Sequence, residues 1–405
     1  MLAAILLLLT VLSPTESYTI AQETKLHTDL FTGYQKAIRP GADRSKPLSI
    51  YVDFLMISLK EFNEEEGRLS VIGAFKFVWT DNRLAWDKNS YGGDLTQTSV
   101  LQDTVWVPNV VNLNCFETMK PLGSSSLSLR MYDGGTVAWI PPALIESSCD
   151  ADVTYYPFDS QTCVIRYYMP GYYQSDVNFS PSRTEADLQQ YEQNNLWEIT
   201  STSLSTFVNS YHFQELQIEL QMQRRSRYYI AGLILPICLM SFLQIMVFVL
   251  PEESGERVGF SVTVLLAVAV FLTIIQESLP EASEPSVSLL AYKLLVDILV
   301  GAMITSTTII GSAIYHKNET DSVPICIKRC VQTCRCKLSC RKASPKVIDV
   351  KSAEKPPPDD FWDEAEDDVI SWRDVGKVFD KCCLIFFTLC LLINNMVLMA
   401  IISLN

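Results

Sequence analysis

Four long apolar segments constrain the fold of this chain more than any other feature of its sequence. Each approaches the roughly 20 residues that an α-helix needs to cross the hydrocarbon core of a bilayer. They are residues 228–250, 258–279, 287–315 and 382–404. The preceding residues, 18–225, read as short strands separated by turns, with period-two alternation of apolar and polar side chains. We therefore expect an all-β, immunoglobulin-like sandwich joined to a four-helix transmembrane bundle.

The ends and loops of the chain predict its topology. Residues 1–17 have the short apolar run and small residues of a secretory signal peptide, so the sandwich is expected outside the cell. Basic residues without acidic neighbours follow the third apolar segment and favour the cytosol. We expect an ectodomain at 18–225, three crossings at 226–315 and a cytoplasmic loop with amphipathic helices at 316–381. The fourth crossing, 382–405, then ends outside a plasma membrane.

Composition excludes several classes of function. The formal net charge is −14, and a nucleic-acid binder needs a clustered basic face that this chain lacks. The sequence has three histidines and no phosphate loop, zinc-ligand motif or nucleophile elbow. We therefore expect neither an enzyme nor a bound cofactor or metal.

Twelve cysteines are divided unevenly along the chain. Only Cys115, Cys149 and Cys163 precede the first apolar segment, and two of these three can pair in an oxidising compartment. Thirteen residues separate Cys149 from Cys163, which suits a stapled hairpin on any secreted domain. Cys115 is expected to be a buried free thiol. Five tryptophans of the strand-rich region are expected to be core residues: Trp79, Trp86, Trp106, Trp139 and Trp197.

The second apolar segment, with its flanks ESGERVGFSVTVLLAVAVFLTIIQE, has acidic residues at both ends and hydroxyl groups along its length. On a helix that begins near Arg257, steps of three and four residues place one set of side chains on a single face. From the inner to the outer end, this set is Gly259, Thr263, Leu266, Val270, Thr273 or Ile274, and Glu277. The order suits a helix that lines water.

Several copies of this helix around an axis would form a pore. Glu256 and Glu277 would be rings of negative charge at its two mouths, with Glu253 added to the inner ring, and such rings concentrate cations and repel anions. Leu266 and Val270 would be apolar rings that dewet a closed pore. The alternative is an ordinary bundle helix whose terminal charges lie at the membrane interface.

A group of motifs together resembles the Cys-loop pentameric ligand-gated ion channels, in particular the cation-selective branch of nicotinic acetylcholine and serotonin type-3 receptors. The motifs are the Cys149–Cys163 spacing with YPFD inside it, Arg225 before the first crossing, Pro236 within it, the segment SGERVGFSVTVLLAVAVFLTIIQESLP, and WTDNRLAW followed by WVPNV. They occur in the family's order and cover essentially the whole mature chain. The resemblance suggests an invertebrate-type member whose agonist the sequence does not identify.

The resemblance implies a pentamer with a Cys149–Cys163 disulfide in each subunit, a pore lined by the second crossing, and an agonist site between neighbouring sandwiches. Glu256 matches the family's cation-selecting position, and Leu266 matches its gate leucine. A further set matches elements that transmit agonist binding to the gate: Glu64, Phe158, Asp159 and Arg225.

The expected agonist site departs from the family pattern, in which aromatic rings hold a cationic amine by cation–π attraction. Leu113, Pro170 and Ala74 stand where aromatic residues are usual, and the stretch between Trp197 and Tyr211 lacks the adjacent cysteine pair of nicotinic α subunits. The remaining aromatic residues either form a different pocket or are surface and core residues without a ligand. The candidates are Tyr168, Tyr172, Phe207, Tyr211 and Phe213.

Two functions are compatible with this sequence. The first is a subunit of an extracellular-ligand-gated cation channel, homopentameric or heteropentameric, that passes monovalent ions and also calcium, with a postsynaptic membrane as one setting. The second is a non-conducting, membrane-anchored binding or accessory subunit that uses only the sandwich. An anchor needs neither acidic mouths nor ordered hydroxyl groups, so the second apolar segment favours the channel.

Asn178 begins a glycosylation sequon on the extracellular side.

Overall fold

The computed structural model describes residues 18–252, 255–277, 287–318, 322–339 and 370–403, and they form two compact units. The first unit comprises residues 18–153 and 158–226, which hold the strands. The second comprises Thr154–Pro157 and the helices from Arg227 onward. The predicted signal peptide, 1–17, lies outside the described residues.

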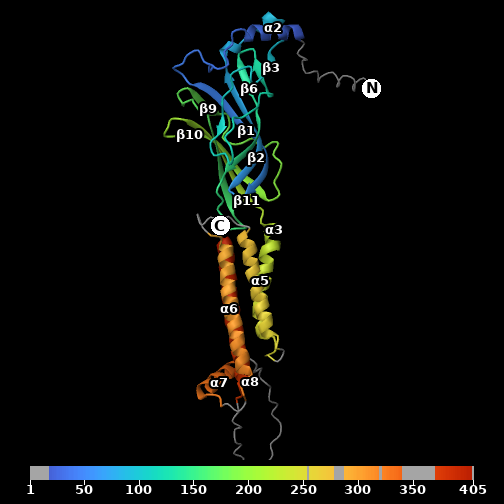
Figure 1. Cartoon of the computed structure of the whole chain (residues 1–405), viewed down its shortest axis with the longest axis vertical. Helices are drawn as coiled ribbons and strands as arrows, with labels where there is room; N and C mark the ends of the chain where they lie inside the picture. Colours follow the sequence, from blue (N-terminus) through green and yellow to red (C-terminus); the bar gives the residue numbers. More distant parts are fainter. Residues whose placement is uncertain (1–17, 253–254, 278–286, 319–321, 340–369, 404–405) are drawn as a thin grey trace, which may run out of the picture. The chain divides into compact units, whose positions relative to one another are not determined.

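The first unit is a sandwich of two β-sheets preceded by helix α2 (Ile20–Phe31), as Figure 1 shows. One sheet has seven strands in the order β3-β5-β6-β2-β1-β9, with β7 paired to β2. Its strands are β1 (Leu48–Asn63), β2 (Arg68–Thr80), β3 (Gln97–Leu101), β5 (Ser128–Tyr132), β6 (Thr136–Trp139), β7 (Pro142–Ser148) and β9 (Val177–Pro181). The other sheet has the order β10-β11-β8-β4. Its strands are β4 (Val111–Asn112), β8 (Ser160–Tyr168), β10 (Trp197–Val208) and β11 (Gln214–Arg224).

Alternating apolar side chains build the core of the sandwich. Along β2 the buried residues include Phe75, Phe77 and Trp79, and Phe77 stacks on Trp139 of β6 with ring centroids 5.4 Å apart. The five tryptophans predicted as core residues are all buried. The β-sandwich predicted from alternation is therefore confirmed.

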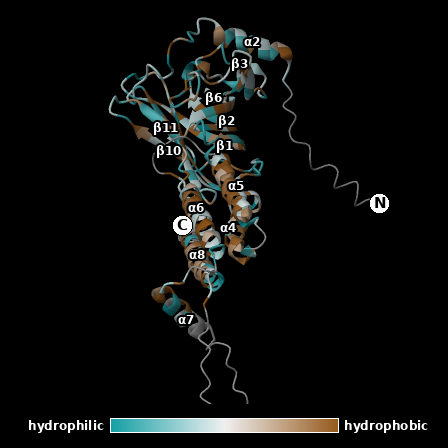
Figure 2. Ribbon diagram, turned by 60° about the horizontal axis from the view of Figure 1, so that its bottom comes forward, coloured by the Kyte–Doolittle hydropathy of each residue, from teal (hydrophilic) through white to brown (hydrophobic). Residues whose placement is uncertain are grey.

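The second unit is helical. Within the described residues, three helical segments are long and apolar enough to cross a membrane: Arg227–Val249, Arg257–Glu277 and Leu289–Tyr315. The first is built from α3 (Arg227–Tyr229), the π-helical turn η4 (Ile230–Ile234), α4 (Leu235–Met246) and η5 (Val247–Val249). The others are α5 (Arg257–Glu277) and α6 (Leu289–Tyr315). Figure 2 shows that apolar residues dominate these helices.

The fourth predicted crossing lies within α8 (Trp372–Ser403), which follows α7 (Ile325–Ser339). Helices α4 to α6 and α8, with η5, share one apolar core, in which Phe248 of η5 stacks on Phe387 of α8. A buried ion pair between Lys293 and Asp297 on α6 extends this packing, because the amide of Asn394 on α8 donates to Asp297 at 2.7 Å. These contacts hold α8 in the bundle, and its crossing of the membrane stays a prediction.

Candidate functional site

Helix α5 presents the predicted pore face as an exposed strip. Glu256, just before the helix, and six residues of the helix are all exposed in the single chain: Gly259, Thr263, Leu266, Val270, Thr273 and Glu277. Leu266 is 63% exposed and Val270 is 50% exposed, unusual values for large apolar side chains unless lipid or another chain covers them. Ile274, the alternative to Thr273, is also exposed. Glu253 lies outside the described residues.

The opposite face of α5 is packed inside the subunit. Its buried residues are Arg257, Ser261, Val264, Val268 and Ile275. Ser261 exchanges a hydrogen bond with Thr305 of α6 at 2.7 Å, which fixes the rotation of α5 about its own axis. The exposed strip is therefore the face of α5 that the subunit itself does not use for packing.

The hydroxyl groups of the strip are held by their own helix. Thr263 donates to the carbonyl oxygen of Gly259 at 2.8 Å, and Thr273 donates to that of Val270 at 2.8 Å. Because the donors are used in this way, the hydroxyl oxygens keep their lone pairs free to face outward. A strip of carboxylates and lone pairs suits cations better than anions.

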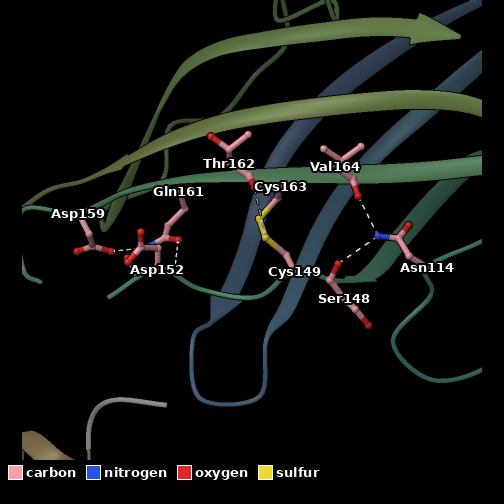
Figure 3. Close-up of a disulfide and its surroundings, with 9 residues drawn as sticks. All are labelled: Asn114, Ser148, Cys149, Asp152, Asp159, Gln161, Thr162, Cys163 and Val164. Atoms are coloured by element: carbon pink, nitrogen blue, oxygen red, sulfur yellow. Dashed lines mark hydrogen bonds between the residues drawn. A yellow bond between two sulfur atoms is a disulfide. The ribbon is translucent and has the colours of Figure 1, made fainter. Parts of the chain in front are cut away.

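A disulfide joins Cys149, just after β7, to Cys163 in β8, and so links the two sheets (Figure 3). Gln161 organises the loop that the disulfide closes: its amide donates to the carboxylate of Asp159 at 2.6 Å and to the carbonyl oxygen of Asp152 at 2.8 Å. The disulfide implied by the family resemblance is confirmed.

A buried arginine lies beside this loop, and it is not the one chosen from the sequence. Arg224 is 5% exposed and donates to both carboxylate oxygens of Asp159, at 2.7 and 3.0 Å. It also pairs with Glu64 at 2.7 Å, and its guanidinium lies 4.3 Å from the ring centroid of Trp197. Arg225 has a side chain that is 37% exposed and lies 3.9 Å from Glu198. The buried arginine beside the disulfide-closed loop is thus Arg224 and not Arg225, and the role of either residue in coupling stays a prediction.

The alternation of inward and outward side chains along β11 explains why Arg224, and not Arg225, is buried. Leu216, Ile218, Leu220 and Met222 face the core, and Arg224 continues the same period-two series. The alternation visible in the sequence could therefore have distinguished Arg224 from its neighbour. Of the other predicted coupling residues, Glu64 and Asp159 contact Arg224, whereas Phe158 is half-buried and takes no part in the contacts of Arg224 described above.

The predicted aromatic residues are only partly brought together. Phe213, in the loop between β10 and β11, stacks on Tyr173 with centroids 5.1 Å apart and meets the edge of Tyr168 at 6.2 Å. Tyr172 instead packs edge-on against Trp106 at 6.5 Å. Phe207 and Tyr211 are exposed. The aromatic cluster is therefore Tyr168, Tyr173 and Phe213, and Tyr173 was not among the predicted ligand residues.

Asn209 sets the shape of the β10–β11 loop and so the place of Phe213. Its side-chain oxygen accepts from the backbone N–H groups of Tyr211 and Phe213 at 3.0 and 3.1 Å. The carbonyl oxygen of His212 accepts from the N–H of Gln174 at 3.0 Å, which ties the loop to the segment that carries Tyr173. The three positions that lack the family's aromatic residues differ in burial: Ala74 is buried, whereas Leu113 and Pro170 are half-buried.

Cys115 is a free thiol, as expected, but it is half-buried and not buried. It lies in the loop after β4, where it lines a cavity of about 290 Å³ together with Tyr167. Burial raises the pKa of Tyr167 strongly, and the nearby Cys115 adds to the shift. Cys115 lies outside the regular strands, where it forms an isolated antiparallel bridge with Ser147 of β7.

Asn178 lies in β9, opposite Ser49 of the parallel strand β1. Its side chain is half-buried and alternates with the buried Val177 and Phe179, so it points away from the core. This orientation is compatible with the predicted glycosylation, which stays a prediction.

Comparison with known families agrees with this architecture. Residues 23–226 match the neurotransmitter-gated ion-channel ligand binding domain, and residues 233–357 match the neurotransmitter-gated ion-channel transmembrane region. Acetylcholine receptor subunit beta-like 1 of Drosophila melanogaster is 31% identical over 315 residues, which are 76% of this chain and 60% of that protein. Neuronal acetylcholine receptor subunit alpha-10 of Homo sapiens is 34% identical over 265 residues, 64% of this chain and 58% of that protein.

A further relative is the acetylcholine receptor subunit beta-type lev-1 of Caenorhabditis elegans, 29% identical over 312 residues, which are 76% of this chain and 61% of that protein. The chain thus spans 58% to 61% of the length of these relatives. The two matched domains follow one another in the same order as the sandwich with its disulfide and the helices that are apolar enough to span a membrane. The family consists of ion channels and not of enzymes. The chain is a multi-pass membrane protein and belongs to the Cys-loop, neurotransmitter-gated ion-channel family, with a nicotinic acetylcholine receptor-like sequence.

Proposed function

We propose that this chain is a subunit of a pentameric, cation-selective channel of the plasma membrane that an extracellular small molecule opens. The observation that carries the proposal is the exposed strip of α5, which runs from Glu256 to Glu277 on the face that the subunit leaves unpacked. Both ends of the strip are acidic and its middle is apolar. Arranged around a common axis, these features make a cation-attracting pore with a hydrophobic constriction.

The proposed gate is the apolar middle of the strip. Leu266 and Val270 lie about one helical turn apart and are both at least half exposed, so copies of them can meet at an axis and exclude water. The proposed permeant ions are monovalent cations and calcium, because exposed carboxylates at Glu256 and Glu277 attract both.

The proposed agonist site is atypical. The cluster of Tyr168, Tyr173 and Phe213 supplies aromatic rings, whereas Leu113, Pro170 and Ala74 supply none where the family usually has them. Fewer ring faces give less cation–π attraction for a quaternary amine. Because the curated relatives are named as acetylcholine receptor subunits, acetylcholine is the reference ligand, and we propose that it activates this chain weakly compared with another small molecule.

Recording current from the full chain expressed alone tests the proposal. A panel of amines, amino acids and other small transmitters is applied while external sodium is lowered. A cation channel shifts its reversal potential to more negative values when external sodium falls, and chloride replacement leaves it unchanged. A reversal potential that follows chloride would contradict cation selectivity, and strong activation by acetylcholine would contradict the atypical site.

The missing aromatic residues favour one second candidate, an accessory subunit that lines the pore but lacks its own agonist site. Such a chain gives no current alone and alters the conductance of a conducting relative when the two are expressed together. Mixed-subunit recordings with Glu256→Gln in this chain distinguish the two cases, because a pore-lining subunit transmits the lost charge to the shared channel.

A further inference from the structure

The positive charge next to Glu256 poses an electrostatic problem for the proposed channel. Arg257 immediately follows Glu256 at the start of α5. If both side chains pointed into the inner mouth, each carboxylate would be neutralised by a guanidinium, and a ring of such pairs would not concentrate cations. The structure resolves this problem through contacts within the subunit.

Arg257 is withdrawn from the exposed strip. It is 2% exposed, whereas Glu256 beside it is exposed. Its two terminal nitrogens donate to the two carboxylate oxygens of Asp380 on α8, at 2.8 Å each, and one of them also contacts the carboxylate of Glu252. The guanidinium lies 5.5 Å from the ring centroid of Phe248. This bidentate geometry is the strong form of an arginine–carboxylate pair.

Asp380 is the partner that reaches across the bundle. It lies 123 residues after Arg257 in sequence, and the stacking of Phe248 on Phe387 holds its helix against η5. Gly311 of α6 leaves room for the contact, since a Cβ atom at that position would lie 3.3 Å from an oxygen of Asp380. The pairing with Arg257 is therefore built by three elements of the bundle, α5, α6 and α8.

The two carboxylates that contact Arg257 outnumber its single positive charge. Glu252 and Asp380 each carry one negative charge against the single positive charge of Arg257, so the group behind the inner mouth is net negative. Loss of either carboxylate leaves a neutral group, and loss of Asp380 also removes both of the bidentate hydrogen bonds. An arginine released in this way can swing toward the mouth, because its side chain is long and adjacent to Glu256.

We propose that Asp380 is a positioning residue for ion selectivity: it holds Arg257 on the packed side of α5, so that Glu256 alone sets the charge of the inner mouth. This inference rests on the proposed channel function. The residue acts through Arg257 and does not itself face the permeation path. A residue of α8 thereby contributes to the ion selectivity of the proposed pore.

The test uses single-channel recording of the full chain, with Leu266→Thr in the background so that the pore conducts without an identified agonist. Asp380→Asn is expected to lower sodium conductance by at least about twofold and to reduce the sodium-to-chloride permeability ratio. Asp380→Glu keeps the carboxylate and is expected to retain most of the conductance. Asp374→Asn is the matched control on the same helix. Asp374 lies in the first turn of α8, where its carboxylate accepts from the N–H of Ser371, and an asparagine side-chain oxygen can also accept there. The carboxylate contacts of Arg257 described above are with Asp380 and Glu252 instead.

The double variant Arg257→Gln with Asp380→Asn separates positioning from structure. With no guanidinium to release, the pair of changes is expected to restore the conductance lost in Asp380→Asn, at equal surface expression. Conductance that is unchanged in Asp380→Asn, or that stays low in the double variant, overturns the inference while the channel function stands. If the background variant instead passes a current whose reversal potential follows chloride and not sodium, the proposed cation-channel function fails, and this inference fails with it.

Discussion

Two buried arginines, one in each unit of the molecule, have the same kinds of partner. Arg224 of the sandwich is held by Asp159 and Glu64 beside the ring of Trp197, and Arg257 of the helical unit is held by Asp380 and Glu252 beside the ring of Phe248. Each has two carboxylates and one aromatic face. In both cases the net charge of the cluster is negative, and the guanidinium is removed from water.

The difference between the two clusters lies in how the chain reaches them. Asp159 lies in the disulfide-closed loop, and strand β11 itself carries Arg224 inward by its alternation. Arg257 faces the bundle only because α5 packs with that side against its neighbours, and its bidentate partner comes from α8. The first cluster ties a strand end to a loop. The second leaves the opposite side of α5 free for the exposed strip.

The largest expected effect distinguishes Arg224 from its neighbour. Arg224→Gln leaves two carboxylates beside a buried position without their cation, and breaking a buried pair in this way costs about 3–5 kcal/mol of folding free energy. Arg225→Gln removes a partly exposed pair, worth about 0–1 kcal/mol. Thermal unfolding of the solubilised protein and surface labelling of cells measure both. Equal losses for the two variants would contradict the assignment of the buried site.

The disulfide provides the next comparison, because it closes the loop that carries Asp159. Replacing Cys149 and Cys163 together by serine is expected to destabilise the sandwich by about 3 kcal/mol, the chain-entropy value for a loop of about 15 residues. The control is Cys115→Ser, which alters a free, half-buried thiol. A loss confined to the sandwich, with the helical unit unfolding at its usual temperature, would sharpen the contrast between the two arginine sites.

A smaller effect is expected for the proposed gate residue Leu266, which lies on the face of α5 opposite to Arg257. Leu266→Thr makes the proposed apolar ring more polar and is expected to raise agonist-free current about tenfold, which corresponds to about 1.4 kcal/mol. Val264→Thr, on the packed face, is the matched control and should act on expression more than on gating. Unchanged current in Leu266→Thr at normal surface expression would remove Leu266 from the gate.

The smallest effect concerns the aromatic faces. The guanidinium of Arg224 lies 4.3 Å from the Trp197 centroid, whereas that of Arg257 lies 5.5 Å from Phe248. Tryptophan also attracts cations better than phenylalanine does, so Phe248→Leu is expected to lose only about 0.5–1 kcal/mol of cation–π attraction. A double-mutant cycle with Arg257→Gln isolates that part from packing. A coupling as large as that between Trp197 and Arg224 would make the two sites equivalent.

Local patterns in the sequence were sufficient for the sandwich and for three helices that are apolar enough to span a membrane, since alternation and apolar length are properties of short stretches. The disulfide was predicted from the resemblance to the channel family, because spacing alone left its pairing open. The exposed strip of α5 was also predictable, because helical geometry fixes which residues share a face. Arg224 could have been found from the parity of β11. The aromatic cluster could not, because Tyr173 meets Phe213 only through the conformation that Asn209 gives to the β10–β11 loop.

The sequence alone therefore determined which segments are strands, which helices are apolar enough for a bilayer, and which residues form one stripe on α5. These features depend on side chains a few residues apart, within reach of one turn or one strand. Only the tertiary structure decided which way that stripe faces and what becomes of the charge beside it. The first depends on the packing of α5 against α6, where Ser261 meets Thr305. The second depends on α8, because the contact of Asp380 with Arg257 spans 123 residues of chain, a distance over which no local pattern specifies a partner.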